Sequence, residues 1–115
     1  MRAWTRIKVP SIMRTDLPGT RGWQRDVADG HLSVLVGREP VPVANGDRVI
    51  LWHLSISHRT NERVPRPGRY PTWDEISDAR YQFIPDSVTM AMLLPPRAEY
   101  VNAHPTTFHL WEVSL

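Results

Sequence analysis

Residues 48–57 read RVILWHLSIS, and this stretch has the clearest strand pattern in the chain. Side chains alternate between the two faces of a β-strand. One face is therefore apolar throughout and belongs in a core, whereas the other face mixes leucine with polar residues. The apolar face carries Ile50, Trp52, Leu54 and Ile56, and the mixed face carries Leu51, His53, Ser55 and Ser57.

A helix is predicted to begin after Thr72. Thr72 and Glu75 have the spacing of a capping box, and Asp74 suits the positive end of the helix dipole. Pro85 ends the helix, because proline cannot continue the backbone hydrogen bonding. The residues expected on the buried stripe are Trp73, Ile76, Tyr81 (or the stem of Arg80) and Phe83.

Weaker strand patterns lie on both sides of these two elements. Asp29-Gly30 is a tight-turn signal, and residues 37–47 are predicted to be a turn-rich connection because they contain Pro40, Pro42 and Asn45-Gly46. The further strands expected are 23–28, 31–36, 88–94 and 107–113. Together these elements predict an α+β fold, an antiparallel sheet of four to five strands with one helix packed on one face.

The composition indicates one globular domain. The chain has 115 residues and five tryptophans, enough apolar area for a single core. We place this domain at residues 23–115 and treat residues 1–22 as a basic N-terminal arm, which holds five basic residues and one acidic residue. The absence of cysteine favours a cytoplasmic protein without disulfides. No run of about 18 apolar residues occurs, so no membrane span is predicted.

Two short motifs have the form His-x-Ser. They are His31-Leu32-Ser33 and His53-Leu54-Ser55, and pairing Val36 with Ile50 would bring their polar side chains opposite one another. His109 could join the same face if Phe108 and Leu110 face the helix. The pattern resembles the paired motifs of two-histidine phosphoesterases, in which the imidazoles act as general acid and base. The alternative is a half-exposed sheet face on which these residues are simply tolerated, and the separation of only 22 residues favours it.

Arginines are frequent in the arm and in the segment 58–70. The segment contains Arg59, Arg63, Arg66 and Arg69. Such residues can contact phosphates, while Trp4 or Tyr70 could stack on bases, so nucleic-acid binding is one hypothesis. A solvated Arg/Pro loop is the more ordinary explanation, since no recognition motif is present.

No cofactor or metal site is predicted. His104 and His109 have no carboxylate at a metal-binding spacing such as His-Glu-x-x-His. Neither a P-loop nor a Gly-x-Gly-x-x-Gly motif occurs.

An ordered series of motifs covers about the last 65 residues: WHLSIS, PTWDEI, LPP, YVNAHP and HLW. The series resembles a small family of unknown function from actinobacterial phages, prophages and bacteria. The resemblance implies a small, phage-encoded protein made in the bacterial cytoplasm, and it implies no activity.

The leading hypothesis is a non-enzymatic protein that binds a host or viral protein through the open sheet face, with self-association as an accompanying hypothesis. Trp111 is the expected hot spot, since alternation sends it to the same face as His109. Hydrolysis or binding of a phosphodiester and nucleic-acid binding are the alternatives. The candidate catalytic residues are His53, Ser55, His31 and His109, and the candidate binding residues are Trp111, His109, His53, Ser55, Arg59, Arg66 and Arg69.

Overall fold

The structure is a computed structural model. It describes residues 3–9, 19–63, 68–85, 88–94 and 106–112. For residues 88–94, 106, 107, 109, 111 and 112 it describes the backbone alone.

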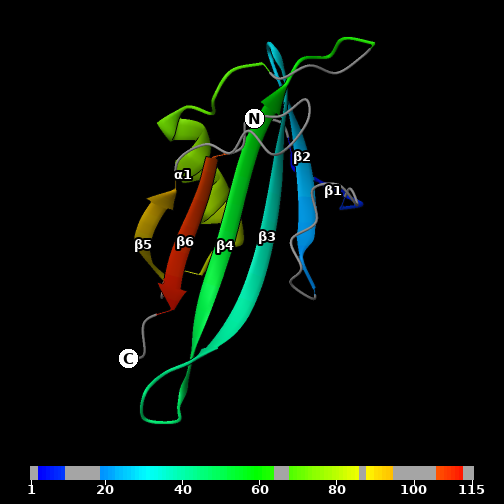
Figure 1. Cartoon of the computed structure of the whole chain (residues 1–115). Helices are drawn as coiled ribbons and strands as arrows, with labels where there is room; N and C mark the ends of the chain where they lie inside the picture. Colours follow the sequence, from blue (N-terminus) through cyan, green and yellow to red (C-terminus); the bar gives the residue numbers. More distant parts are fainter. Residues whose placement is uncertain (1–2, 10–18, 64–67, 86–87, 95–105, 113–115) are drawn as a thin grey trace.

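Six strands form one antiparallel sheet in the order β1-β2-β3-β4-β6-β5. Figure 1 shows this sheet with the helix α1 behind it. The elements are β1 (Thr5–Ile7), β2 (Arg21–Val27), β3 (Gly30–Pro42), β4 (Arg48–Arg59), α1 (Trp73–Phe83), β5 (Val88–Leu94) and β6 (Thr106–Glu112). The α+β class is confirmed. The number of strands exceeds the four to five expected, because part of the basic arm pairs with β2 as the edge strand β1.

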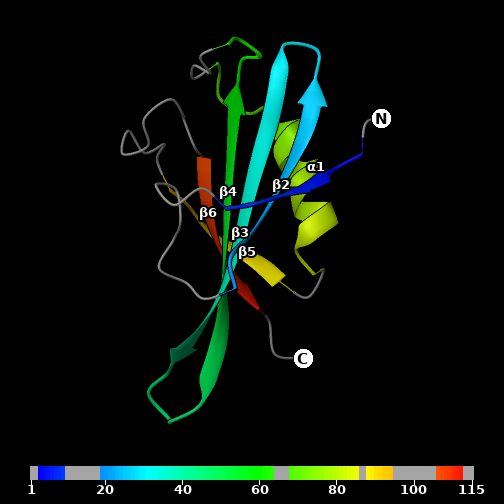
Figure 2. The same cartoon turned by 90° about the vertical axis from the view of Figure 1, so that its right-hand side faces the viewer.

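The hairpin of β3 and β4 is longer than the sequence predicts. Residues 37–42 are strand, so most of the expected connection 37–47 is part of the sheet. The turn is short, and the Val43 N–H donates to the Asp47 carbonyl at 3.0 Å. Pro40 and Pro42 fit in β3 because β2 pairs with β3 only as far as Val36, which leaves their missing N–H groups on an unpaired side. This hairpin extends well beyond the other strands (Figures 1 and 2).

Figure 2 shows α1 beside one face of the sheet. Leu54 and Ile56, on the apolar face of β4, pack in one buried cluster with residues of the helix. Ile76, Ala79 and Ile84 from the helical region share a buried cluster with sheet residues. The sheet contributes Val34, Val36, Leu54, Ile56, Phe108 and Leu110. No helix in the described part of the chain is long and apolar enough to cross a membrane.

The capping box of α1 is present as predicted. The Glu75 N–H donates to the Thr72 hydroxyl at 3.2 Å, and the Thr72 N–H donates to the Glu75 carboxylate at 2.9 Å. The predicted buried stripe is wrong at two positions, because Trp73 is 61% exposed and Tyr81 is 76% exposed. Trp73 still contacts the buried Phe108 edge-on, with ring centroids 6.3 Å apart. The stem of Arg80, the alternative to Tyr81, is half-buried, and Ile76 and Ala79 are the buried residues of the helix.

Candidate functional site

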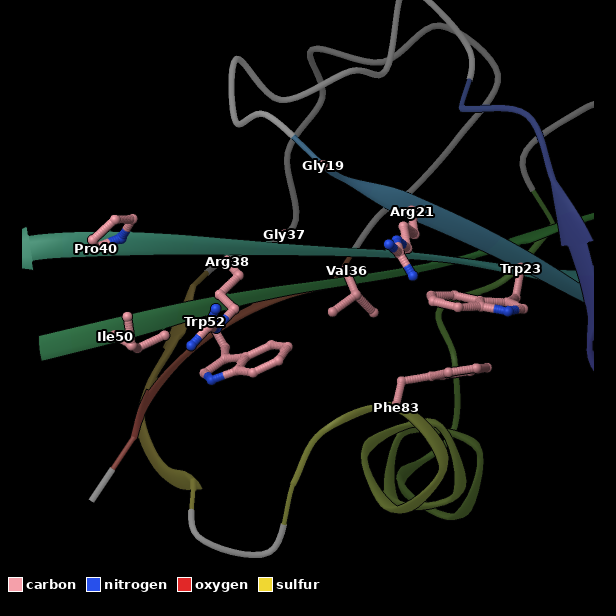
Figure 3. Close-up of a pocket in the computed structure, with 10 residues that line it drawn as sticks. All are labelled: Gly19, Arg21, Trp23, Val36, Gly37, Arg38, Pro40, Ile50, Trp52 and Phe83. Carbon is pink, nitrogen blue, oxygen red and sulfur yellow. The ribbon is translucent and has the colours of Figure 1, made fainter. Parts of the chain in front are cut away.

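A pocket of about 440 Å³ opens beside the C-terminal end of α1. Figure 3 shows that its walls come from β2, β3, β4 and the last residue of the helix. It is lined by Gly19, Arg21, Trp23, Val36, Gly37, Arg38, Pro40, Ile50, Trp52 and Phe83. Three aromatic rings and two arginines thus meet in one hollow, which we call the aromatic–arginine pocket.

The aromatic wall is built on a stacked pair. The rings of Trp23 and Phe83 lie with centroids 4.2 Å apart and an interplanar angle of 22°. Trp4 contacts Phe83 edge-on, with centroids 5.3 Å apart. Both arrangements are favoured by the charge distribution of aromatic rings. Trp4 was a candidate for stacking on bases in the sequence analysis. In the structure it packs against Phe83, behind the pocket wall.

Polar contacts hold this wall in place. The Trp4 indole donates to Asp78 Oδ2 at 3.2 Å, and Arg25 Nη1 lies 2.6 Å from the same oxygen. The Arg25 guanidinium also lies over the Trp4 ring, 4.8 Å from its centroid. Since Asp78 belongs to α1 and Arg25 to β2, these bonds fix the helix against the sheet beside Trp4, whose ring supports Phe83 in the pocket wall.

The arginines of the pocket face solvent. Arg21 and Arg38 are exposed, and neither forms an ion pair with any residue that the structure describes. The Arg38 guanidinium lies 5.6 Å from the centroid of Trp52, and that of Arg6 lies 5.3 Å from the centroid of Trp23. These cations are thus held near aromatic rings with their hydrogen-bond donors available.

An acidic hollow at the other end of α1 has the opposite character. It is lined by Arg25, Asp26, Val27, Ala28, Asp74, Glu75 and Asp78. Four carboxylates repel an anion there, whereas none of the described residues that line the aromatic–arginine pocket is a carboxylate. Of these two hollows, the aromatic–arginine pocket is the one that suits a ligand combining a planar ring with negative charge.

The structure does not bring the two His-x-Ser motifs together. His31 lies opposite Arg59, and His53 lies opposite Gly37. The predicted pairing of Val36 with Ile50 is wrong, because β3 and β4 continue to a turn at residues 43–47 and Val36 pairs with Leu54. His31 and Gly37, the residue opposite His53, are six residues apart on β3, which is about 20 Å at roughly 3.3 Å per residue.

His53 has a different set of neighbours. Its Nε2 lies 2.9 Å from Glu39 Oε2, and His109 is its register partner on β6. His31 Nδ1 lies 3.1 Å from Asn61 Oδ1 instead. The side chains of His109 and Trp111 lie outside the described residues. No three His, Asp or Glu side chains cluster as metal ligands in the part of the chain whose side chains are described.

The face of the sheet away from α1 is less open than predicted. Leu35, Leu51 and Ser57 on this face are buried, and the His53 side chain is only 19% exposed. Ser55 is half-buried. A partner therefore has little accessible area at these positions of β3 and β4.

Arg69 from the arginine-rich segment joins three parts of the fold. It donates to both carboxylate oxygens of Asp29 and to both of Glu75, at 2.7 to 3.1 Å. His58 lies buried beside this network, with Nε2 3.2 Å from Asp29 Oδ1 and Nδ1 accepting from the Arg69 N–H. Arg69 thus has a structural role, Arg59 is half-buried, and Arg66 lies outside the described residues.

The charged groups in this network shift one another's pKa values. Hydrogen bonds from Arg69 lower the pKa of Asp29 from 3.8 to about 2. Burial acts to raise the pKa of Glu75, but hydrogen bonds from Arg69 and Thr72 outweigh it and lower that pKa. The bonds to Glu75 and Asp29 in turn raise the pKa of Arg69 above its usual range.

Sequence reasoning missed the pocket residues Arg21, Trp23, Arg38 and Phe83 as a site. Arg21 and Trp23 are two residues apart on one strand, and Arg38 stands opposite Trp52, so both pairs become neighbours only through strand alternation and register. The usable signal was the alternation of arginine and tryptophan in residues 21–25, which reads RGWQR.

The fold and the pocket define a small α+β protein with a cationic, aromatic hollow between sheet and helix. The chain belongs to the family described as Domain of unknown function (DUF7694), which matches residues 41–114. No curated protein and no solved structure matches the chain. The match includes Trp52 and Phe83 but not Arg21, Trp23 or Arg38, and seven of the ten lining residues lie outside the family match.

Proposed function

We propose that this protein binds nucleotide units of nucleic acid in the aromatic–arginine pocket, with the base against the rings and the phosphate against the arginines. The observation that carries the proposal is the meeting of three aromatic rings with Arg21 and Arg38 in one hollow, with no carboxylate among the lining residues that the structure describes. Stacking of a base on an aromatic side chain contributes about 1–3 kcal/mol and tolerates any base. Arginine adds charge-assisted hydrogen bonds to phosphate.

The proposal places the basic N-terminal segment at the pocket. Arg6 and Arg21 both lie in residues 1–22, and Arg6 stands over Trp23. The hypothesis of nucleic-acid binding therefore moves from the loop 58–70, where Arg69 is held by two carboxylates, to β2 and β3.

Contacts within the protein hold the aromatic wall of the pocket in place. Trp23 is stacked on Phe83, and Phe83 is supported by Trp4. A preorganised wall reduces the ordering that binding requires, which favours affinity.

Fluorescence anisotropy with a labelled ten-residue oligothymidylate tests the proposal. We expect wild-type protein to bind, with affinity falling steeply as salt rises. Exchanging both arginines, Arg21→Gln with Arg38→Gln, should weaken binding at least about tenfold and make the salt slope shallower by about 1.4, since each lost phosphate contact on a single strand contributes about 0.7.

The matched control exchanges two exposed arginines outside the pocket, Arg48→Gln with Arg63→Gln. It removes the same net charge and should change affinity by less than about threefold. Equal losses in the two double variants, or no binding by wild-type protein at low salt, would overturn the proposal.

Binding of a protein partner through the opposite face stays a prediction that depends on Trp111 and His109. A hydrolytic role of His53 also stays a prediction, and so does a location in the cytoplasm of a phage-infected bacterium. The burial of Leu35 and Leu51 gives the partner hypothesis less support than the pocket gives to nucleotide binding.

A further inference from the structure

A shallower hollow of about 480 Å³ adjoins the aromatic–arginine pocket. It is lined by Trp52, Tyr81, Gln82, Phe83, Ile84 and Pro85. Trp52 and Phe83 line both hollows, so the two share a wall. A ligand that enters one of them can therefore continue into the other across these rings.

Tyr81 gives the second hollow a base-binding surface. Its side chain is 76% exposed although it is a large aromatic residue. None of its lining residues in the described part of the chain is charged, so it suits the apolar face of a base better than a phosphate. Its character thus complements the first hollow, where the arginines stand.

Arg38 lies at the wall between the two hollows. Its guanidinium is held 5.6 Å from the centroid of Trp52, the tryptophan that both hollows share. A phosphate that links a base in the first hollow to a base in the second would pass this wall. Arg38 is therefore placed to neutralise the linking phosphate, and Arg21 to meet the phosphate at the other end of the first nucleotide.

We infer that the ligand is single-stranded nucleic acid, bound through two consecutive nucleotides, one in each hollow. This inference rests on the proposed function of the pocket. A duplex does not fit the same geometry, because its bases are stacked on one another and their faces are not available to protein rings.

A length series of thymidine ligands tests the inference, with binding measured by quenching of tryptophan fluorescence. We expect the dinucleotide pTpT to bind about tenfold more tightly than thymidine monophosphate, and a ten-residue strand to bind at least as tightly as the dinucleotide. A blunt duplex should compete at least about tenfold more weakly than the single strand. Parallel series with DNA and RNA identify the sugar that is preferred.

Tyr81→Ala separates this inference from the proposed function. The variant should weaken pTpT binding about tenfold and leave monophosphate binding unchanged, because Tyr81 lines only the second hollow. Trp73→Ala removes another exposed aromatic residue of α1 and should leave both affinities unchanged.

Equal affinities for mono- and dinucleotide, or unchanged pTpT binding by Tyr81→Ala, would overturn the two-base inference while nucleotide binding itself stands. Preference for the duplex would overturn it as well. Failure of every nucleotide to bind would overturn the proposed function instead.

Discussion

The ring of Phe83 stacks on the ring of Trp23, with centroids 4.2 Å apart and an interplanar angle of 22°. Phe83 is the last residue of α1 and Trp23 lies in β2, so this contact joins the helix to the sheet. Both rings also line the aromatic–arginine pocket. Stability and the proposed nucleotide binding are therefore expected to depend on the same pair.

Phe83→Ala should lower both properties. We expect a loss of about 2 kcal/mol in the free energy of unfolding, below the range for a fully buried phenylalanine because Phe83 is only half-buried. Urea denaturation measures it. Tyr81→Ala, two residues earlier and mostly exposed, should change stability by less than about 0.5 kcal/mol. Equal effects of the two variants would contradict the stacked wall.

Asp78 supports the wall from behind, where it accepts from both Trp4 and Arg25. Asp78→Ala leaves the Arg25 guanidinium, whose side chain is only 10% exposed, without this partner. We expect a loss of about 2 kcal/mol in thermal or urea unfolding. Asp74→Ala, on an exposed position of the same helix, should lose less than about 1 kcal/mol. A larger effect at Asp74 would contradict this account.

The Arg69 network predicts a dependence of stability on acid. The folded-state pKa of Asp29 is lowered to about 2 and that of Glu75 is lowered as well. A carboxyl group whose pKa is lower in the folded than in the unfolded protein stabilises the fold at pH values above its unfolded pKa of about 4. This stabilisation is lost as the pH falls toward the folded-state pKa. Urea midpoints should therefore drop between about pH 4.5 and pH 2.

Arg69→Gln should remove much of this dependence. The variant should be less stable than wild-type protein at pH 7, and the difference should shrink as pH falls, because both carboxylates then lose their charge in either protein. Arg63→Gln, an exposed arginine on the same segment, is the control and should follow the wild-type curve. A difference in stability between the Arg69→Gln variant and wild-type protein that stays constant at all pH values would show that Arg69 acts by packing alone.

Gly68 is predicted to tolerate no side chain. A Cβ built at this position collides with the imidazole of His58, which is buried. Gly68→Ala should therefore lower the free energy of unfolding by about 2 kcal/mol or more. Gly46→Ala at the hairpin turn has open space around it and should lose about 1 kcal/mol, from its positive φ of 86° alone. The reverse order would show that His58 moves aside easily.

The sequence predicts most elements but not their neighbours. Alternation in residues 48–57 identifies β4 and the face that meets the core, and the Thr72–Glu75 spacing identifies the start of α1. The register of β3 on β4 could not be predicted, because Pro40 and Pro42 suggest a loop and their tolerance depends on where β2 ends. That register also separates His31 from His53.

The sequence did not predict the pocket, because the pocket also depends on strand register. Trp52 was predicted to be a core residue, and Leu54 and Ile56 on the same face of β4 are indeed buried. Trp52 itself is half-buried and lines a hollow, because its register partner on β3 is the exposed Arg38 and not an apolar residue. Such a site arises from the length of a hairpin and from one helix end, and neither is encoded in a local motif.

Indole N–H signals of the protein labelled with ¹⁵N test the central claim most directly, since each tryptophan gives one signal that can be assigned by substitution. On titration with pTpT the indole signals of Trp23 and Trp52 should shift together with one dissociation constant, and that of Trp73 should stay in place. Shifts at Trp73 without shifts at Trp23 and Trp52, or no shifts at all at millimolar ligand, would contradict nucleotide binding in the aromatic–arginine pocket.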